Sequence, residues 1–182
     1  MKNPRLIIVS NRLPYQFIER KGQLKIIPSS GGLVSSIKSY IQKQNEGKGE
    51  KTHLPALWVG SADITEKKFN GFVKQGNLFH NDIELNPVFL PSTVKDKHYN
   101  GFCNNTIWPL FHYFPSYAKF SDEYFEHYET ANRFFYEKLI KVYQPGDLVW
   151  IHDYHLMLLP AMLRKNIPGA AIGFFLHIPF PS

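Results

Sequence analysis

Residues 5–12 read RLIIVSNR, a short apolar run of mostly β-branched residues followed by polar ones. Such a run is typical of a strand buried within a sheet, so we predict a buried strand over Arg5–Ser10. Short apolar runs return at Ala56–Gly60, at Asn86–Leu90, at Leu148–Ile151 and at Ala171–Leu176. We therefore predict strands at these places too, the one over Leu148–Ile151 buried like the first.

Apolar residues at helical spacing lie between these strands. The spacing predicts a helix that starts just after Gly32, a long helix over Asp122–Tyr143 and a shorter one over Leu156–Lys165. Strands that alternate with helices indicate an α/β fold with a mostly parallel sheet.

Three further segments are irregular or antiparallel in pattern. Tyr15–Ile27 is typical of a β-hairpin with a turn that contains glycine, and Asn45–His53 of a surface loop. Tyr99–Tyr117 is rich in aromatic residues and interrupted by two prolines. We predict short helical turns and loop there.

Composition narrows the class of protein. The chain has 182 residues, enough for one buried core, and a single cysteine, Cys103, which allows no internal disulfide. No apolar run reaches the roughly 18 residues of a membrane-spanning helix. A soluble protein of the cytoplasm, without a membrane partner, is the expectation.

The net charge of +6 falls within residues 1–91, where the lysines are scattered rather than clustered. A scattered basic excess argues against nucleic acid as a partner. A small anion such as a sugar phosphate or a nucleotide remains open.

Polar residues follow four of the predicted strands, at Asn11-Arg12, Gly60-Ser61, His152-Asp153 and His177. Ligands of parallel α/β sheets bind beyond the carboxyl ends of the strands, so we expect a site where these residues meet. Arg12 is a candidate for a phosphate or carboxylate, with a surface arginine as the alternative. Ser29–Gly32 precedes a helix and is either a phosphate loop or a plain turn.

The histidines have two interpretations. His152, Asp153, His155 and His177 could form a metal site, although their spacing is not that of a helical zinc motif. Histidines bonded to the backbone are the alternative. Cys103 has no histidine or aspartate at a catalytic spacing and is a poor candidate nucleophile. For the aromatic residues, sugar stacking competes with core packing.

Taken together, several stretches resemble the N-terminal part of the trehalose-6-phosphate synthase family of retaining glucosyltransferases. The stretches run in the family's order from Ile8 to Pro181: IVSNR at 8–12, GGL at 31–33, LWVG at 57–60, HYNGF at 98–102, WPLFHY at 108–113, WIHDYH at 150–155 and GFFLHIPFP at 173–181.

The resemblance implies a GT-B fold, in which two Rossmann-like domains with helices on both faces of the sheet face each other across a cleft. Residues 1–182 would be the N-terminal, acceptor-side domain, and the C-terminal nucleotide-sugar domain would lie outside this chain. The implied reaction transfers glucose from UDP-glucose, a co-substrate, to glucose 6-phosphate. The products are α,α-trehalose 6-phosphate and UDP.

The resemblance also implies roles for individual residues. Arg12 would bind the acceptor phosphate, and Tyr99, Trp108 and Asp153 the acceptor glucose. Gly31 and Gly32 would meet the donor diphosphate, and His177 the donor sugar. His177 and Asp153 would position substrate in the transition state. No protein nucleophile, metal or cofactor is implied.

Two departures from the family accompany the resemblance. Many members carry tryptophan where this chain has Ser61, which puts an acceptor role for Trp58 in doubt. Without a second domain the 182-residue chain is expected to have little or no transferase activity.

Several alternatives stay open. They are another phosphorylated acceptor such as glycerol 3-phosphate (a glucosylglycerol-phosphate synthase), a non-catalytic sugar-phosphate-binding domain, and a metal-dependent hydrolase. Whether the protein forms a homo-oligomer is also open.

Overall fold

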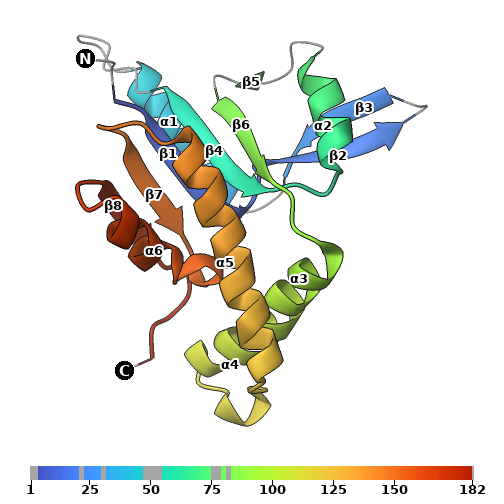
Figure 1. The fold of residues 1–182 in the computed structure, drawn as a ribbon, viewed down its shortest axis with the longest axis vertical. Coiled ribbons are helices and arrows are strands. Elements are labelled where there is room, and N and C mark those ends of the chain that lie inside the picture. The colour runs from blue at the N-terminus through green and yellow to red at the C-terminus, as the bar shows by residue number, and fades with distance from the viewer. Residues whose placement is uncertain are drawn as a thin grey trace.

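The structure, a computed structural model, describes residues 4–20, 23–29, 32–46, 55–74, 79–80 and 83–181. Its centre is a sheet of six strands in the order β5-β6-β4-β1-β7-β8 (Figure 1). Neighbouring strands are parallel except β5, which runs antiparallel to β6. The strand bounds are β1 Leu6–Arg12, β4 Ala56–Ser61, β5 Phe79–His80, β6 Ile83–Val88, β7 Leu148–His152 and β8 Ala171–Phe175.

Strand β1 lies in the middle of the sheet, between β4 and β7. Ile7, Ile8 and Val9 are completely buried, which confirms the first predicted strand. The strand runs on to Arg12, two residues beyond the predicted end, and its register with β4 shifts between Val9 and Arg12.

Both faces of the sheet are covered, and two apolar cores result. One core lies against α1 (Gly32–Glu46), α2 (Glu66–Val73) and the hairpin of β2 (Tyr15–Arg20) and β3 (Gln23–Pro28). The other lies against α5 (Asp122–Val142) and α6 (Leu159–Asn166). The predicted α/β class, with helices on both faces of a mostly parallel sheet, is confirmed, and so are the hairpin and the long helix.

The strand order reverses at β1. The chain proceeds from β1 outward through β4 to β6, and then crosses back over the sheet through α5 to β7 and β8 (Figure 1). The gap between the carboxyl ends of β1 and β7 is therefore the topological switch point, where sheets of this kind bind ligands.

A continuous helical stretch over Ser92–Phe111 corrects the prediction of short turns and loop in its first part. It consists of α3 (Ser92–Asp96), a π-helix η1 (Lys97–Ile107) and α4 (Trp108–Phe111). Where the π-helix ends, the Trp108 N–H bonds to the Cys103 carbonyl, five residues back. Pro109 is tolerated because it lies in the first turn of α4, where the hydrogen-bond pattern changes. The later 3₁₀ turn η2, Pro115–Tyr117, agrees with the prediction.

Other element boundaries differ from the predicted ones. Strand β6 begins at Ile83 rather than Asn86 and ends at Val88, and its Pro87 is tolerated because the short β5 pairs only with Ile83 and Glu84. The last helix begins at Leu159 because Tyr154–Leu156 forms a separate 3₁₀ turn, η3. The predicted turn residues 21–22 and most of the predicted loop, 47–53, lie outside the described residues.

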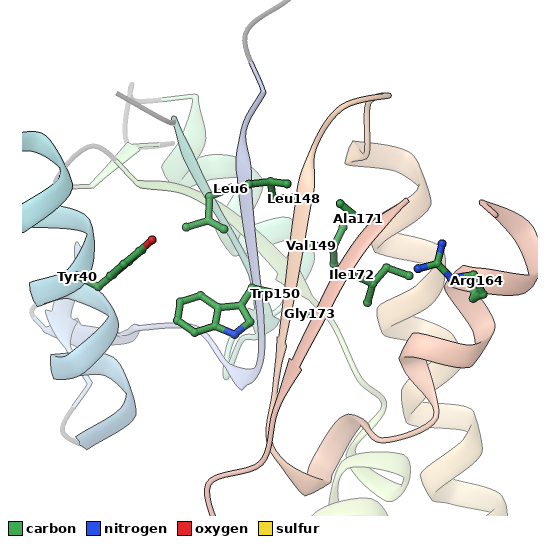
Figure 2. A pocket seen from close by; sticks show the side chains of 9 residues that line it. All are labelled: Leu6, Tyr40, Leu148, Val149, Trp150, Arg164, Ala171, Ile172 and Gly173. Carbon is green, nitrogen blue, oxygen red and sulfur yellow. The ribbon is translucent and has the colours of Figure 1, made fainter. Parts of the chain in front are cut away.

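The β7–β8 side of the sheet carries an apolar groove of about 670 Å³ (Figure 2). Tyr40 of α1 and Trp150 of β7 point toward each other across it, with ring centroids 5.8 Å apart. Leu148 is 41% exposed and Phe175 is 50% exposed. The predicted burial of the strand at 148–151 is therefore wrong at Leu148, because its side chain lines this open groove and is not covered by another described element. No helix in the described ranges is long and apolar enough to cross a membrane.

Candidate functional site

A cavity of about 320 Å³ opens at the switch point between β1 and β7. Its residues come from the ends of both strands, from the loop before α1, from η1 and from the turn after β7. They are Ser10, Asn11, Arg12, Leu13, Ser29, Gly32, Val34, Tyr99, His152, Asp153 and His155. Segments far apart in the sequence thus meet at the carboxyl ends of the strands. This is where the polar residues at the strand ends led us to predict a site.

The carboxyl end of β1 is held by three polar contacts with β4 and within β1 itself. The Trp58 indole N–H donates to Ser10 Oγ over 2.8 Å, and Ser10 Oγ donates to the Arg12 carbonyl over 2.7 Å. The Ser61 hydroxyl donates to the Asn11 carbonyl. Trp58 is completely buried, so it is a core residue whose polar edge fixes the strand that carries Arg12.

Close backbone approach at this strand end requires a glycine at position 60. A Cβ atom there would lie 2.5 Å from the Arg12 carbonyl carbon and 2.5 Å from the Leu13 nitrogen. The backbone of β4 therefore touches the residues that begin the cavity wall. Gly60 and Ser61 were predicted to follow their strand, but they are its last two residues; both support β1, and neither lines the cavity.

Arg12 is exposed, and its guanidinium lies over the Tyr99 ring, 5.0 Å from the ring centroid. Tyr99 in turn stacks on His155, with centroids 5.6 Å apart and ring planes 8° apart. No carboxylate in the described part of the chain forms an ion pair with Arg12. The arginine is thus oriented by an aromatic stack, and its charge is free for an anionic ligand.

Burial keeps the base of this stack uncharged. Desolvation lowers the pKa of His155 to about 3, with smaller contributions from His98 and Arg12. A neutral imidazole under Tyr99 adds no positive charge that would repel the guanidinium.

Helix α1 presents its N-terminus to the same cavity through Gly32. Its first turn holds no acidic residue, and a Cβ at Gly32 would meet no atom within 4 Å. Ser29, just before the helix, bonds to the end of β1: its N–H donates to the Pro14 carbonyl and its hydroxyl to the Leu13 carbonyl. An anion has open access to the positive end of the helix here. Gly31 lies outside the described residues.

Asp153 joins the ends of β7 and β8. Its Oδ1 accepts the N–H groups of Tyr154, at 3.0 Å, and His177, at 3.3 Å, and its own N–H donates to the Phe175 carbonyl. The backbone has φ 75° and ψ 166°, a region in which residues other than glycine are strained. Burial raises the pKa of its carboxyl group, against the effect of the two N–H bonds.

A buried polar cluster of His98, Asn132 and Tyr128 forms hydrogen bonds to the turn after β7. His98 Nε2 lies 3.1 Å from the His155 carbonyl, and Asn132 Nδ2 donates to the same oxygen. The Tyr128 hydroxyl donates to the Tyr154 carbonyl and accepts the Met157 N–H. Sequence reasoning missed His98 and Asn132, because the bonds that give them a role join η1 and α5 to a distant turn.

Among the described residues, the three histidines of the predicted metal set do not show the ring-to-backbone bonds that were the alternative prediction: His152 and His177 contact each other, and His155 Nδ1 lies 3.6 Å from Asp153 Oδ2. His152 Nδ1 lies 3.0 Å from His177 Nε2, and burial lowers the pKa of His152 to about 4. Within the described ranges no three His, Cys, Asp or Glu side chains are grouped so as to hold a metal ion. Cys103 is buried, and burial raises the pKa of its thiol, so it is not an activated nucleophile.

Four predicted ligand residues line the cavity: Arg12, Gly32, Tyr99 and Asp153. His177 lies next to it, through its contacts with Asp153 and His152. Trp108 is not a lining residue; it is 43% exposed and stacks on His112, with centroids 4.1 Å apart. The ligand roles of all these residues stay predictions.

A mostly parallel sheet that reverses at β1 defines a Rossmann-like domain, and the arginine, helix N-terminus and carboxylate at the reversal form its candidate ligand site. The sequence matches Glycosyltransferase family 20 over residues 4–182. The chain belongs to glycosyltransferase family 20.

Curated relatives share this sequence along nearly its whole length. The alpha,alpha-trehalose-phosphate synthase [UDP-forming] A of Dictyostelium discoideum is 43% identical over 98% of this chain and 23% of its own length. The alpha,alpha-trehalose-phosphate synthase [UDP-forming] of Yarrowia lipolytica is 41% identical over 98% of this chain and 37% of its own. The chain thus spans roughly a quarter to a third of these relatives.

Solved structures share the fold. An alpha,alpha-trehalose-phosphate synthase from Burkholderia xenovorans in complex with glucose-6-phosphate superposes with a TM-score of 0.70 at 28% identity, over 98% of this chain and 34% of that one. A structure from E. coli bound with UDP-2-fluoro glucose gives a TM-score of 0.71 at 30% identity, over 98% and 34% of the two chains.

Proposed function

We propose that the chain is the acceptor-side domain of a GT-B enzyme. The enzyme transfers glucose from UDP-glucose to glucose 6-phosphate with retention, forming α,α-trehalose 6-phosphate and UDP. Relatives named as trehalose-phosphate synthases and the structure bound to glucose-6-phosphate support this proposal. The observation that carries it is the meeting of Arg12, Tyr99, Gly32 and Asp153 around one cavity at the switch point.

The acceptor fits the β1 side of the cavity by chemistry. Arg12 supplies a fixed cation for the phosphate, because the Tyr99 ring holds its guanidinium in place. Asp153 supplies a hydrogen-bond acceptor for the sugar hydroxyls. Its Oδ1 already accepts two backbone N–H groups, whereas Oδ2 lies 3.6 Å from His155 Nδ1 and accepts no hydrogen bond from the described residues, so Oδ2 is the oxygen we assign to the ligand. Trp108 would add an apolar surface beside the glucose.

The donor fits the α1 and β8 side. The open N-terminus of α1 at Gly32, with Gly31 before it, favours the diphosphate of UDP-glucose, and His177 would contact the transferred sugar. A second, nucleotide-binding domain would close the cleft from the opposite side. Our proposal places it outside this chain.

Retention in this scheme needs no protein nucleophile. Retaining glycosidases use two carboxyl groups about 5–5.5 Å apart. Asp153 is the only carboxylate among the described residues that line the cavity. We propose that the donor phosphate assists attack by the acceptor on the sugar face from which it departs. The proposed reaction uses no metal or cofactor. We propose the cytoplasm as its location. Self-association of the protein stays an open prediction.

Calorimetric titration of the 182-residue chain tests acceptor binding. Glucose 6-phosphate should bind, and glucose and glycerol 3-phosphate should bind more weakly. Arg12→Ala should weaken glucose 6-phosphate by about 10- to 100-fold, the value of one charge-assisted hydrogen bond. Arg20→Ala, on the exposed end of β2, is the matched control and should change nothing. Stronger binding of glycerol 3-phosphate would reassign the acceptor.

A transferase assay tests the need for a second domain. With UDP-glucose and glucose 6-phosphate, the chain alone should release almost no UDP, because an open cleft does not exclude water or hold the leaving group. Substantial disaccharide phosphate from this chain would refute that requirement, whatever the titration shows.

A further inference from the structure

A pair of histidines connects the ends of two neighbouring strands beside the cavity. His152 ends β7 and is 1% exposed, whereas His177 follows β8 and is exposed. His152 Nδ1 lies 3.0 Å from His177 Nε2, with ring centroids 5.3 Å apart. Two neutral imidazoles at this distance share one proton between the facing nitrogens, so one ring donates and the other accepts.

The direction of this hydrogen bond follows from the other nitrogen of His152. His152 Nε2 is buried and has no hydrogen-bond partner among the described residues. If His177 were the donor, His152 would carry its own proton on Nε2, as a buried N–H without an acceptor. If His152 donates from Nδ1, Nε2 keeps only a lone pair. Buried unpaired N–H groups are the rarer and costlier case.

His98 shows the same choice in the same structure. Its Nε2 faces the His155 carbonyl, which can only accept, so Nε2 must carry the proton. The buried Nδ1 of His98, which also has no partner within the described ranges, is therefore a bare lone pair. An orphaned imidazole lone pair is thus tolerated next to this site.

We infer that His152 is a positioning residue: it donates from Nδ1 to His177 Nε2 and holds His177 in the tautomer that carries its proton on Nδ1. Fixing one ring nitrogen through the other is the usual way in which proteins select a histidine tautomer. Both rings are neutral at pH 7.5, because burial lowers the pKa of His152 to about 4 and also lowers the pKa of His177.

The consequence is a defined hydrogen-bond direction at the ligand. With Nε2 occupied by His152, the nitrogen that His177 offers to a ligand is a donor and not an acceptor. It fits a hydroxyl or phosphate oxygen. This assignment of a ligand atom rests on the proposed function, whereas the tautomer itself does not.

Nitrogen NMR of the ¹⁵N-labelled 182-residue chain, without substrate, tests the tautomer. Long-range ¹H–¹⁵N correlations at pH 7.5 should show His177 with a protonated Nδ1 and an unprotonated, hydrogen-bonded Nε2. His152→Asn should keep this pattern, because its amide can donate in place of the imidazole. His152→Leu removes the donor and should release His177 to a mixture of tautomers. His127→Leu, a half-buried residue of α5 whose Nδ1 contacts the Glu123 carbonyl and not the histidine pair, is the control and should leave His177 unchanged.

Two results would overturn the inference: a protonated Nε2 on His177 in the unmodified chain, or an unchanged His177 tautomer in folded His152→Leu. If His152→Leu fails to fold, the unmodified chain and His152→Asn still decide. Failure of glucose 6-phosphate to bind would remove the proposed function and leave the tautomer result standing. The two failures are therefore distinguishable.

Discussion

The guanidinium of Arg12 lies 5.0 Å from the centre of the Tyr99 ring, so the end of the central strand is held against the π-helix η1. Tyr99 itself rests on the neutral ring of His155. Among the described residues that line the cavity, Arg12 is the one cation, and within the described ranges it is oriented by stacking and not by a carboxylate. An ion pair would neutralise the charge that an anionic ligand needs, and the stack leaves it available.

Removing the Tyr99 ring should therefore weaken anion binding without removing any charge. Tyr99→Leu should reduce the affinity of the 182-residue chain for glucose 6-phosphate by about 2- to 30-fold, the range of a cation–π contact. Tyr99→Phe keeps the ring and should bind nearly as the unmodified chain does. In calorimetry, Tyr99→Leu and Arg12→Ala should be non-additive. Full additivity would show that the ring does not act through Arg12.

Substitution of Gly32 should change ligand binding without lowering the stability of the fold. A methyl group there meets no protein atom within 4 Å, so Gly32→Ala should leave the urea unfolding free energy unchanged or slightly higher. The same methyl group occupies the open end of α1 and should weaken UDP-glucose in a ligand-observed NMR titration. Unchanged UDP-glucose binding would remove the α1 terminus from the donor site.

Loss of the Asp153 charge should have little effect on the free energy of unfolding but should weaken ligand binding. Asp153→Asn keeps a side-chain oxygen for the Tyr154 N–H, so unfolding free energy should change by less than about 1 kcal/mol. Glucose 6-phosphate binding should fall about 10- to 100-fold, because a charged acceptor is lost. Asp122→Asn, at the start of α5, is the matched control for binding. A normal affinity in Asp153→Asn would exclude this carboxylate from the acceptor site.

Two glycines predict opposite effects of the same substitution. Gly60→Ala places a methyl group 2.5 Å from the backbone of Arg12 and Leu13, and should destabilise the chain by about 1–3 kcal/mol or more. Gly71→Ala, within α2, meets nothing within 4 Å and should stabilise it by about 0.5–1 kcal/mol. Urea unfolding of the two variants measures both signs. Equal effects would contradict the tight contact between β4 and β1.

Acid should destabilise the chain through its buried histidines. Burial lowers the pKa values of His98, His152 and His155 from 6.5, to about 4 for His152 and about 3 for His155. The unfolded chain therefore binds more protons than the folded chain below pH 6.5. The stability that these histidines contribute is complete above this pH and declines as the pH falls.

Urea unfolding between pH 7.5 and 5.0 measures this loss as proton uptake on unfolding. His98→Gln retains an amide donor for the His155 carbonyl but does not titrate, so its pH slope should be shallower. The raised pKa of Asp153 acts in the opposite direction, and only at the lower pH where carboxyl groups titrate. A pH-independent stability would contradict the neutral buried histidines.

Local patterns were sufficient for much of the fold. The β-branched run at Ile7–Val9 and the apolar stripe of α5 depend only on residues near in sequence, and both elements appear where they were predicted. The exposure of Leu148 was not predictable, since it depends on whether another element covers β8. The helix through Pro109 was missed because proline interrupts an α-helical pattern, and the π-helix before it has no comparable sequence signal.

The candidate site likewise has features that the sequence could predict and features that it could not. Arg12 and Asp153 were predictable because each lies at or just after the carboxyl end of a strand, and the carboxyl ends of parallel strands share one edge. The bond from Trp58 to Ser10 was not, because it depends on the register of β4 against β1. The cluster of His98 and Asn132 joins elements whose proximity only the folded chain shows.

The strand order also implies that the two sides of the site differ in local stability. Arg12 belongs to β1, which has a parallel partner on each side, whereas His177 follows β8, which pairs with β7 alone among the strands of the described residues. Backbone amides of an edge strand exchange with solvent through smaller openings than those of a central strand. We therefore expect the strand end that carries Arg12 to open less readily than the strand that precedes His177. The two sides of the site should therefore differ in local stability, with the Arg12 side the more rigid and the His177 side the more easily displaced.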